Sequence, residues 1–323
     1  MTVPSKTAKI ARKPEHLAKV KQLSQIDSTK AAWSVIRQWL VIGGVAAAAI
    51  WSGHWLVYAI AIVVIATRQH ALGILQHDAC HYRLFKTRWV NEFVGNIACA
   101  LPLGFLVTRY RDDHTQHHRD PNTEKDPYFL IFQSNPRDWD WPKRPFHALM
   151  VLAKDLFGLN THTTAREFSN WYPTKNHFGE AGEPIPLTWG DRFTTYLFFI
   201  ALFALLWVTN GWVYFAILWL LPYMTIAQFL VRVRTIAEHH ALEEESGTDA
   251  TRHVDPTLLE ALSISPLNIN CHLVHHIFPS IPQYNLPAMT DILFADPEFA
   301  EVAHRSQGYL GKNGVIRREL LAT

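Results

Sequence analysis

The stretch WSGHWLVYAIAIVVIATRQHALGILQHDACH, residues 51–81, decides the fold of this chain. It opens on a short turn, continues as an apolar run from Trp55 to about Leu75, and ends with His77 and His81. A helix needs about 20 predominantly apolar residues to cross the hydrocarbon core of a membrane. The stretch therefore predicts a transmembrane helix that carries two histidines, four residues apart on one face, at its end.

Three more apolar blocks resemble membrane spans in length and composition: residues 33–50, 193–208 and 212–231. The turns within the two pairs of blocks, residues 51–54 and 209–211, contain no Lys, Arg, Asp or Glu, whereas the N-terminal segment is rich in lysine. Lys and Arg are enriched on the cytoplasmic side of a membrane. We therefore expect two helical hairpins, with both termini, the long middle segment and the histidines in the cytoplasm. Buried helices of a soluble bundle are the less favoured alternative.

The composition agrees with an integral membrane protein. Hydrophobic residues make up 49% of the 323 residues and charged residues 18%, against about 25% charged in soluble domains. The net charge of +2 shows no excess of basic residues of the kind that binds nucleic acid, so nucleic acid is not expected as a partner. The three cysteines form no CxxC pair, so neither a disulfide framework nor a thiolate zinc site is expected.

We expect the chain to have three parts. Residues 1–30 form a basic cytoplasmic segment, residues 31–295 a membrane domain, and residues 296–323 a cytoplasmic tail. A fifth apolar stretch, residues 90–107, contains Asn, Glu, Pro and Gly, and we interpret it as a re-entrant or interfacial segment. The predicted fold is an all-α integral membrane protein with four transmembrane helices in two hairpins and a helical cytoplasmic cap.

Eighteen histidines are the unusual feature of the composition, and many of them gather in four clusters. Two clusters have the spacing HxxHH, which places three imidazoles on one helix face. A third is the HDACH of the opening stretch, and a fourth is an EHH sequence after the last apolar block. The clustered histidines are His77, His81, His114, His117, His118, His239, His240, His272, His275 and His276.

This many imidazoles on one predicted side of the membrane indicates a metal site. Imidazole suits zinc, copper, iron and nickel, but a catalytic zinc takes about three protein ligands. A zinc protease would also contain HExxH, which does not occur in this sequence. Eight or nine histidines suggest two metal ions, and two irons fit the count better. Iron also supplies oxygen chemistry.

Five carboxylates lie beside the histidine clusters. A ligating histidine usually donates its other ring N–H to a carboxylate or a carbonyl. A helix cap or a solvated surface acid is the alternative reading for each of these residues. The candidates are Asp78, Asp113, Asp120, Asp126 and Glu238.

The boxes HDACH, HTQHH and HLVHH, interleaved with two membrane hairpins, resemble the membrane fatty acid desaturase and hydroxylase superfamily over roughly residues 30–295. The segments HHRDPNTEKDPY (117–128) and HHIFPSIPQYNLP (275–287) are similar to those that follow the second and third boxes in bacterial desaturases. Family members hold two irons with these histidines. They use O2 and two electrons to remove hydrogens from an acyl chain, or to insert oxygen in the hydroxylase branches.

The resemblance implies a ligand set, carried over position by position. An EH pair supplies a ligand after the last span in the alkane hydroxylase branch, so His239 is preferred to His240. Thr235 stands where acyl-CoA desaturases have an asparagine, and Val274 where many bacterial desaturases have an acid. The implied iron ligands are His77, His81, His114, His117, His118, His239, His272, His275 and His276.

The function implied by the resemblance is an O2-dependent di-iron desaturase that introduces a double bond into a fatty acyl chain or acyl lipid. A membrane di-iron hydroxylase or oxygenase acting on an acyl, alkyl or terpenoid chain is the alternative. A non-enzymatic metal-binding membrane protein is a more distant one. A transporter would place ionisable residues within its spans, whereas these histidines lie outside the predicted spans.

The resemblance also implies partners and a location. The substrate is expected to be an acyl lipid, an acyl-CoA or an acyl chain on acyl carrier protein. No HPGG stretch of the haem-binding cytochrome b5 type occurs, so a separate donor such as ferredoxin, rubredoxin or a cytochrome b5-like protein is expected to bring electrons. We expect a multi-pass protein of the bacterial inner membrane.

Overall fold

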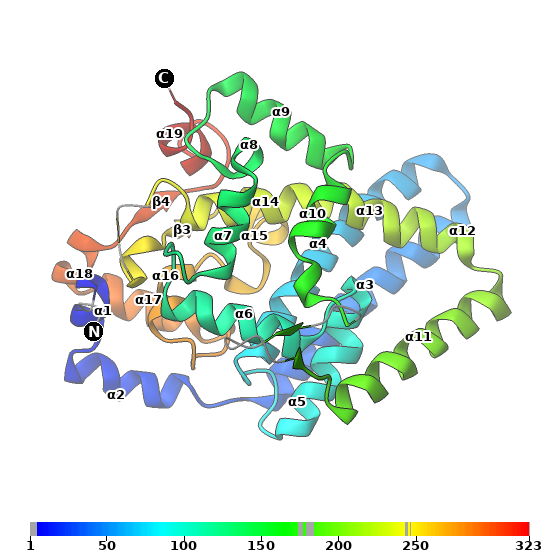
Figure 1. Ribbon diagram of the computed structural model, residues 1–323, viewed down its shortest axis with the longest axis horizontal. Coiled ribbons are helices and arrows are strands. Elements are labelled where there is room, and N and C mark those ends of the chain that lie inside the picture. The colour runs from blue at the N-terminus through cyan, green and yellow to red at the C-terminus, as the bar shows by residue number, and fades with distance from the viewer. Residues whose placement is uncertain (1–4, 174–176, 179–183, 243–244, 246, 323) are drawn as a thin grey trace. The chain divides into compact units, whose positions relative to one another are not determined.

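The computed structural model describes residues 5–173, 177–178, 184–242, 245 and 247–322, and it is mostly helical (Figure 1). The chain divides into two compact units. Unit 1 comprises Met1–Ile26, Asp113–Ala153 and Leu230–Thr323, and unit 2 comprises Asp27–Asp112 and Lys154–Phe229. The helices α6 (Val107–Arg119), α9 (Pro145–Leu156) and α14 (Ile226–His239) each begin in one unit and end in the other.

Unit 2 holds the long apolar helices. Its elements, apart from the three shared helices, are α3 (Ser28–Ser52), α4 (Trp55–Cys80), α5 (Arg88–Val94), the π-helical η1 (Gly95–Ala100), the 3-10 turn η2 (Leu101–Leu103), α10 (Thr161–Glu167), the 3-10 turn η3 (Ser169–Trp171), β1 (His177–Phe178), β2 (Pro184–Ile185), α11 (Trp189–Thr209), α12 (Trp212–Phe215), the π-helical η4 (Ala216–Leu220) and α13 (Leu221–Met224). The strands β1 and β2 pair antiparallel.

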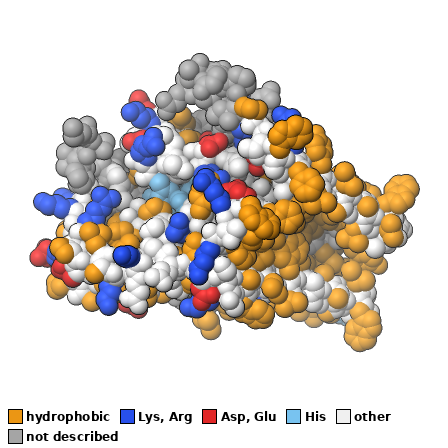
Figure 2. Space-filling model, turned by 90° about the horizontal axis from the view of Figure 1, so that it is seen from below, with side chains coloured by type: hydrophobic (Ala, Val, Ile, Leu, Met, Phe, Trp, Pro, Cys, Tyr) orange, Lys and Arg blue, Asp and Glu red, His pale blue; other side chains and the backbone are white. Residues whose placement is uncertain are grey.

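Four helical stretches are long and apolar enough to span a membrane: Ser28–Ser52, Trp55–Cys80, Trp189–Thr209 and Trp212–His239. Each contains one of the four predicted blocks and extends beyond it. Many of their large apolar side chains are exposed, among them Trp207 at 79%. Figure 2 shows hydrophobic side chains gathered densely toward the α11–α12 end of the view. A large exposed apolar surface of this kind marks contact with lipid or with another protein. The predicted all-α membrane protein is confirmed, while the two-hairpin arrangement and the cytoplasmic cap stay predictions.

The first two spans are joined by only two residues. Gly53 ends α3 in the left-handed region, at φ 62°, where a glycine needs no strain. His54 then accepts a hydrogen bond at Nδ1 from the backbone N–H of Leu56 and so caps the first turn of α4. α3 packs along α4 within unit 2. The charge-free turn of the sequence is thus a left-handed cap followed at once by an N-cap.

The fourth span is irregular around Pro222. The π-helical η4 ends just before Pro222, and Thr225 leaves helical geometry at φ −125° and ψ −96°. Proline cannot donate to the carbonyl one turn earlier, and π-bulges and prolines are the usual causes of such kinks. The irregularity therefore covers about ten residues on both sides of Pro222.

The fifth apolar stretch does not form one straight helix. Residues 88–103 run as α5, η1 and η2, and a sharp bend at residues 104–106 precedes α6. Gly104 takes φ 84° at this bend, a left-handed conformation that favours glycine. This geometry is that of a broken span or a re-entrant loop, in keeping with the predicted re-entrant segment.

Unit 1 is made of shorter elements. Apart from the shared helices they are α1 (Lys6–Ala11), α2 (Pro14–Leu23), α7 (Pro127–Ser134), α8 (Pro136–Trp139), the 3-10 turn η5 (Gly247–Ala250), β3 (His253–Asp255), α15 (Leu258–Ser263), the 3-10 turn η6 (Pro266–Asn268), α16 (His272–Ile277), α17 (Leu286–Phe294), α18 (Pro297–Val302), β4 (Arg305–Gln307) and α19 (Val315–Glu319). The strands β3 and β4 pair in parallel, with His253 opposite Arg305.

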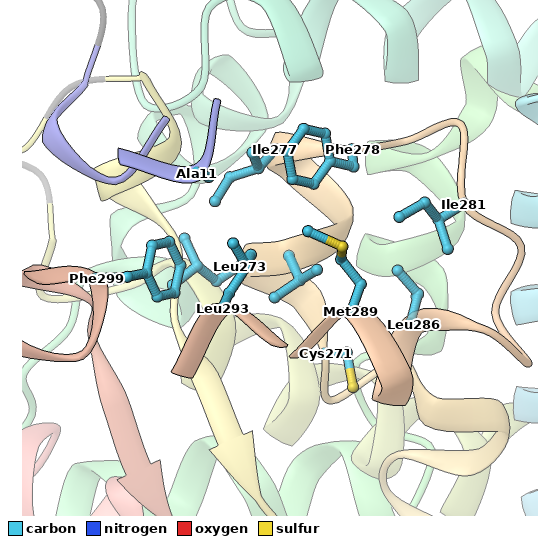
Figure 3. Close-up of a cluster of buried hydrophobic side chains, with 11 residues drawn as sticks. Ala11, Cys271, Leu273, Ile277, Phe278, Ile281, Leu286, Met289, Leu293 and Phe299 are labelled. Atoms are coloured by element: carbon cyan, nitrogen blue, oxygen red, sulfur yellow. The ribbon is translucent and has the colours of Figure 1, made fainter. Parts of the chain in front are cut away.

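The core of unit 1 lies behind the third histidine box. Leu273, Val274 and Ile277 of α16 belong to one buried apolar cluster with side chains of α17. Figure 3 shows Leu273 and Ile277 gathered with Met289 and Leu293. Residues 272–276 therefore divide between two faces, apolar side chains toward this core and histidines away from it. Val274 is fully buried in the cluster, so an acid at this position would be desolvated among apolar groups.

The N-terminal helices α1 and α2 pack within the same unit. The carboxylate of Asp249 accepts hydrogen bonds from the backbone N–H groups of Lys6 and Thr7, at 2.8 and 3.0 Å. Lys13 pairs with Asp296 at 2.7 Å. These contacts tie the basic segment to the region that follows the last span. The three-part division expected from the sequence stays a prediction.

Candidate metal centre

Four histidines from three separate segments of unit 1 form one buried cluster. We call His117, His239, His272 and His276 the four-histidine cluster. α6 carries the first, α14 ends with the second, and α16 carries the other two. One ring nitrogen of each lies within 4.8 Å of those of the others. The Nε2 atoms of His239 and His272 are 2.7 Å apart. Such convergence of imidazoles can hold a metal ion.

The chemistry of the four-histidine cluster fits a metal ion. Neither ring nitrogen of His276 has a hydrogen-bond partner among the residues that the structure describes. Burial, followed by the neighbouring rings of His118 and His272, holds the pKa of His276 well below its usual range. The imidazole is therefore neutral at pH 7, which is the protonation state that ligates metal.

Three more histidines of unit 1 converge beside the first set. His118 lies with its Nε2 atom 3.0 Å from that of His114 and 3.1 Å from that of His275. Tyr128 adds a contact that the sequence did not indicate: its hydroxyl lies 3.0 Å from Nδ1 of His114. The Tyr128 ring also stacks on His117, with centroids 4.5 Å apart. The only signal for it was its place in the DPY that follows the second box.

The first box lies in unit 2, at the end of α4. The rings of His77 and His81 are 4.9 Å apart between centroids, as expected one helical turn apart. Burial lowers the pKa of His81 to about 3, with Arg111 and Arg83 adding to the effect, so this imidazole is neutral as well. Arg111 donates to the carbonyl of Cys80 at 2.6 Å.

Two side chains that sequence reasoning missed thus hold the end of α4. Besides Arg111, which also pairs with Glu92 at 2.6 Å, Asn91 donates from Nδ2 to the carbonyl of Ala79 at 2.9 Å. The last carbonyls of a helix have no partner within the helix. These contacts satisfy two of them and fix the direction in which the first box leaves α4.

Asp126 is the carboxylate most closely tied to a histidine. It is fully buried, and Nδ1–H of His117 donates to its Oδ2 at 2.8 Å. The same carboxylate accepts hydrogen bonds from the backbone N–H groups of Asn122, at 3.0 Å, and Tyr128, at 2.9 Å. Through the bond from Tyr128, Asp126 is the N-cap of α7. The helix-cap reading and the histidine-partner reading therefore both hold for Asp126. With Nδ1 occupied, Nε2 of His117 is left to face a metal.

The other four carboxylates are placed differently. Oε2 of Glu238 lies 3.5 Å from Nδ1 of His272, and Glu238 is fully buried. Asp120 instead accepts a hydrogen bond from Gln116 at 2.7 Å. Asp78 and Asp113 are buried. A role beside the metal stays a prediction for all five carboxylates.

The two histidines of the EHH sequence have different surroundings. His239 joins the four-histidine cluster, whereas the ring of His240 packs at 4.8 Å from Phe132 and 6.1 Å from Trp139, between centroids. Burial and the cations of Arg232 and Lys143 lower the pKa of His240 to about 3. His240 is thus a neutral ring in an aromatic packing site, and the preference for His239 as the ligand stays a prediction.

The buried Arg252, which the sequence did not single out, secures the end of α14. Its guanidinium donates to the carbonyls of Ala237 and His240 and pairs with Glu319 at 2.9 Å. A cation is favourable at a helix C-terminus, where carbonyls gather. This contact fixes the point at which His239 leaves the helix.

A cavity of about 570 Å³ opens beside His239 within unit 1. Aromatic side chains of α7, α8 and the following loop make up much of its wall, and none of the described residues that line it is Lys or Arg. The lining residues are Asn122, Phe129, Phe132, Gln133, Pro136, Trp139, Asp140, Trp141, His239 and His240.

Replacing Asp126 with asparagine is expected to weaken metal binding and activity by about 10–100-fold. Asparagine caps helices as well as aspartate does, so α7 keeps its cap, but the charge that orients and polarises His117 is lost. Metal affinity is measured by competition with a chelator, alongside turnover. Asp120→Asn is the matched control and should change little, because Asp120 bonds Gln116. Equal losses in both variants would contradict the role given to Asp126.

The fold and the site define a class: a membrane protein whose buried histidines are arranged as a metal site. The family model described as fatty acid desaturase matches residues 53–308. The chain therefore belongs to the fatty acid desaturase family, and it is an oxidoreductase of the desaturase type.

Characterised relatives agree with this family. The chain is 30% identical to a dihydrorhizobitoxine desaturase of Bradyrhizobium elkanii, over 88% of this chain and 81% of the relative. It is 25% identical to an sn-1 acyl-lipid omega-3 desaturase (ferredoxin) of Nostoc sp., over 90% and 81%. An sn-1 oleoyl-lipid 12-desaturase of Synechocystis sp. is 28% identical, over 66% of this chain and 61% of the relative.

Proposed function

We propose that this chain is an O2-dependent di-iron desaturase that introduces a double bond into a fatty acyl chain or acyl lipid. The observation that carries the proposal is the buried four-histidine cluster in a chain of the fatty acid desaturase family. Imidazole-only ligation suits iron, and a buried site keeps water away from the reacting carbon.

Nine histidines would hold the two irons. The four-histidine cluster would hold one ion. His114, His118 and His275 would hold the other, with His77 and His81 completing its ligands. The converging ring nitrogens of the four-histidine cluster, and the close Nε2 atoms of His118 with His114 and His275, support this division. The family membership supports a metal site. Bound iron supplies the reaction with O2 that allows unactivated C–H bonds to be broken.

The protein's own side chains orient and neutralise this site. Asp126 accepts a hydrogen bond from Nδ1–H of His117, which leaves Nε2 of His117 to face the metal position. Glu238 lies 3.5 Å from Nδ1 of His272. The aromatic rings that line the neighbouring cavity, Phe129, Phe132, Trp139 and Trp141, suit an apolar chain. We therefore place the acyl chain in this cavity, beside His239.

Desaturation with O2 needs two electrons from outside the substrate. The balanced reaction converts CH2–CH2, O2, two electrons and two protons into CH=CH and two waters. We infer a separate donor: a ferredoxin, a rubredoxin or a cytochrome b5-like protein. The name of the Nostoc relative contains ferredoxin, which favours ferredoxin among these. An acidic donor would be steered by basic residues of the cytoplasmic face.

The substrate carrier and the location are part of the same proposal. The names of the Nostoc and Synechocystis relatives specify acyl-lipid substrates, which favours an acyl lipid over acyl-CoA or acyl carrier protein. The name of the Bradyrhizobium relative specifies a different compound, dihydrorhizobitoxine. Charge-free turns and the lysine-rich N-terminal segment support two hairpins in the bacterial inner membrane, with the termini and histidines cytoplasmic.

Product analysis separates this function from its nearest rival. Expression in a bacterium under 18O2 should yield lipids with an added double bond and no 18O in the acyl chain. A hydroxylase or oxygenase acting on an acyl, alkyl or terpenoid chain at the same site would leave 18O in its product. The matched control is the His239→Ala variant, whose lipid profile should equal that of cells without the protein. Purified protein that contains no iron, or that holds zinc at full occupancy and consumes no O2, would instead indicate a non-enzymatic metal-binding protein.

A further inference from the structure

The helix α9 is apolar on two opposite faces. Ala148 and Val151 are buried against the protein on its inner face. On its outer face Phe146, Leu149 and Met150 are 68%, 63% and 42% exposed. Their i, i+3, i+4 spacing gathers them into one stripe. An exposed apolar stripe marks a surface in contact with lipid or with another protein, so the outer face of α9 needs an apolar partner.

The length of α9 excludes a transmembrane span. Its twelve residues extend about 18 Å at 1.5 Å per residue, whereas the hydrocarbon core is about 30 Å thick. The apolar stripe continues with Leu156 and with Phe157 beyond the helix end, which are 40% and 73% exposed. A short helix with a continuous apolar stripe suits a position in the plane of the interface.

The charges of α9 favour a lipid surface over another partner. Arg144 is exposed just before the helix, and Lys154 shares one edge of it with His147, seven residues earlier. The acid of the helix, Asp155, is buried and accepts a hydrogen bond from Asn160 at 2.9 Å. The outer face therefore combines apolar side chains with cations and has no exposed acid, which matches acyl chains below and anionic head groups beside them.

We propose that α9 lies flat in the lipid–water interface, with Phe146, Leu149 and Met150 in the membrane and Lys154 reaching toward the head groups. α9 begins four residues after Trp141, which lines the aromatic cavity. The contact holds this wall of the cavity at the membrane surface, where acyl chains carried by lipids are within reach. This membrane contact of α9 does not depend on whether the chain catalyses desaturation.

Spin-label accessibility in lipid nanodiscs tests the proposal. A nitroxide is attached to Leu149→Cys on the outer face and, as the matched control, to Arg317→Cys, an exposed position on α19. The three native cysteines are buried, so the label goes to the introduced site. The discs contain phosphatidylglycerol and phosphatidylethanolamine. We expect the ratio of O2 to water-soluble nickel-chelate collisions to be several-fold higher at Leu149→Cys than at Arg317→Cys.

Two results would overturn the proposal. Equal nickel-chelate access at the two sites would place α9 in water. An immobile label at Leu149→Cys, shielded from both O2 and nickel, would show that a protein surface, such as a second copy of the chain, covers α9. The readout needs only the folded, membrane-inserted chain, so loss of enzyme activity in either variant does not affect it.

Discussion

His239→Ala is expected to abolish activity, by about 100-fold or more, and to remove about one of the two irons, whereas the neighbouring variant His240→Ala keeps its metal. His239 contributes one of the four converging ring nitrogens that the described residues place in its cluster. Losing even a partner of a metal ligand commonly reduces affinity or activity by about 10–100-fold, and losing the ligand itself should do more. Iron per chain and lipid product are measured on the same preparations.

The pair of variants is matched in position and burial. Both histidines are 5% exposed and adjacent in sequence. His240→Ala removes ring contacts with Phe132 and Trp139 and should lower stability by about 1–3 kcal/mol, the usual range for a buried truncation. Its iron content should stay at the wild-type level. The reverse pattern, with iron lost only from His240→Ala, would reassign the ligand to His240.

His77→Ala is expected to abolish activity as completely, with iron falling from two ions per chain toward one. His77 is the member of the first box that belongs to α4 itself, and it is buried at the end of that helix. The proposal gives it to the second ion. Removing a ligand of one ion should leave the four-histidine cluster able to bind the other. Iron analysis and thermal unfolding are measured together, so that loss of metal is distinguished from loss of fold.

A histidine at the opposite end of the same helix is the control for this second prediction. His54→Ala removes only the exposed N-cap of α4, which costs about 1 kcal/mol, and should retain both irons and full activity. Wild-type iron content in His77→Ala would remove this residue from the ligand set. A loss of both irons in His54→Ala would show that the metal content follows helix stability instead of ligation.

The Asp126 and Asp120 pair shows where sequence reasoning reached its limit. Both were expected as partners of the histidines, because both follow the second box in a turn. In the structure, Asp126 forms a hydrogen bond with His117, whereas Asp120 forms one with Gln116. The difference depends on how residues 120–126 fold back on α6, and this path is set by hydrogen bonds such as that from Asn122 to Asp126. Side-chain direction in a turn has no periodic signature in the sequence.

Several contacts that the sequence did not reveal join a side chain of one element to the backbone of another. Arg252 holds the end of α14, Asn91 and Arg111 hold the end of α4, and α1 is tied to Asp249. Each is a polar side chain that satisfies backbone groups of another element. Their residue types are ordinary for a surface, and only burial shows that they carry structure.

The sequence by itself determined what is periodic and local. Apolar runs predicted the four candidate spans, and the i, i+3, i+4 spacing predicted which histidines share a helix face. Tertiary structure alone decided which of these faces meet. His117 lies more than 100 residues before His239, and His272 and His276 follow on a third segment, yet all four converge where α16 rests on the core behind it. It likewise decided that His240 packs against aromatic rings, because two adjacent helical residues point about 100° apart and the fold determines which of them faces the cluster.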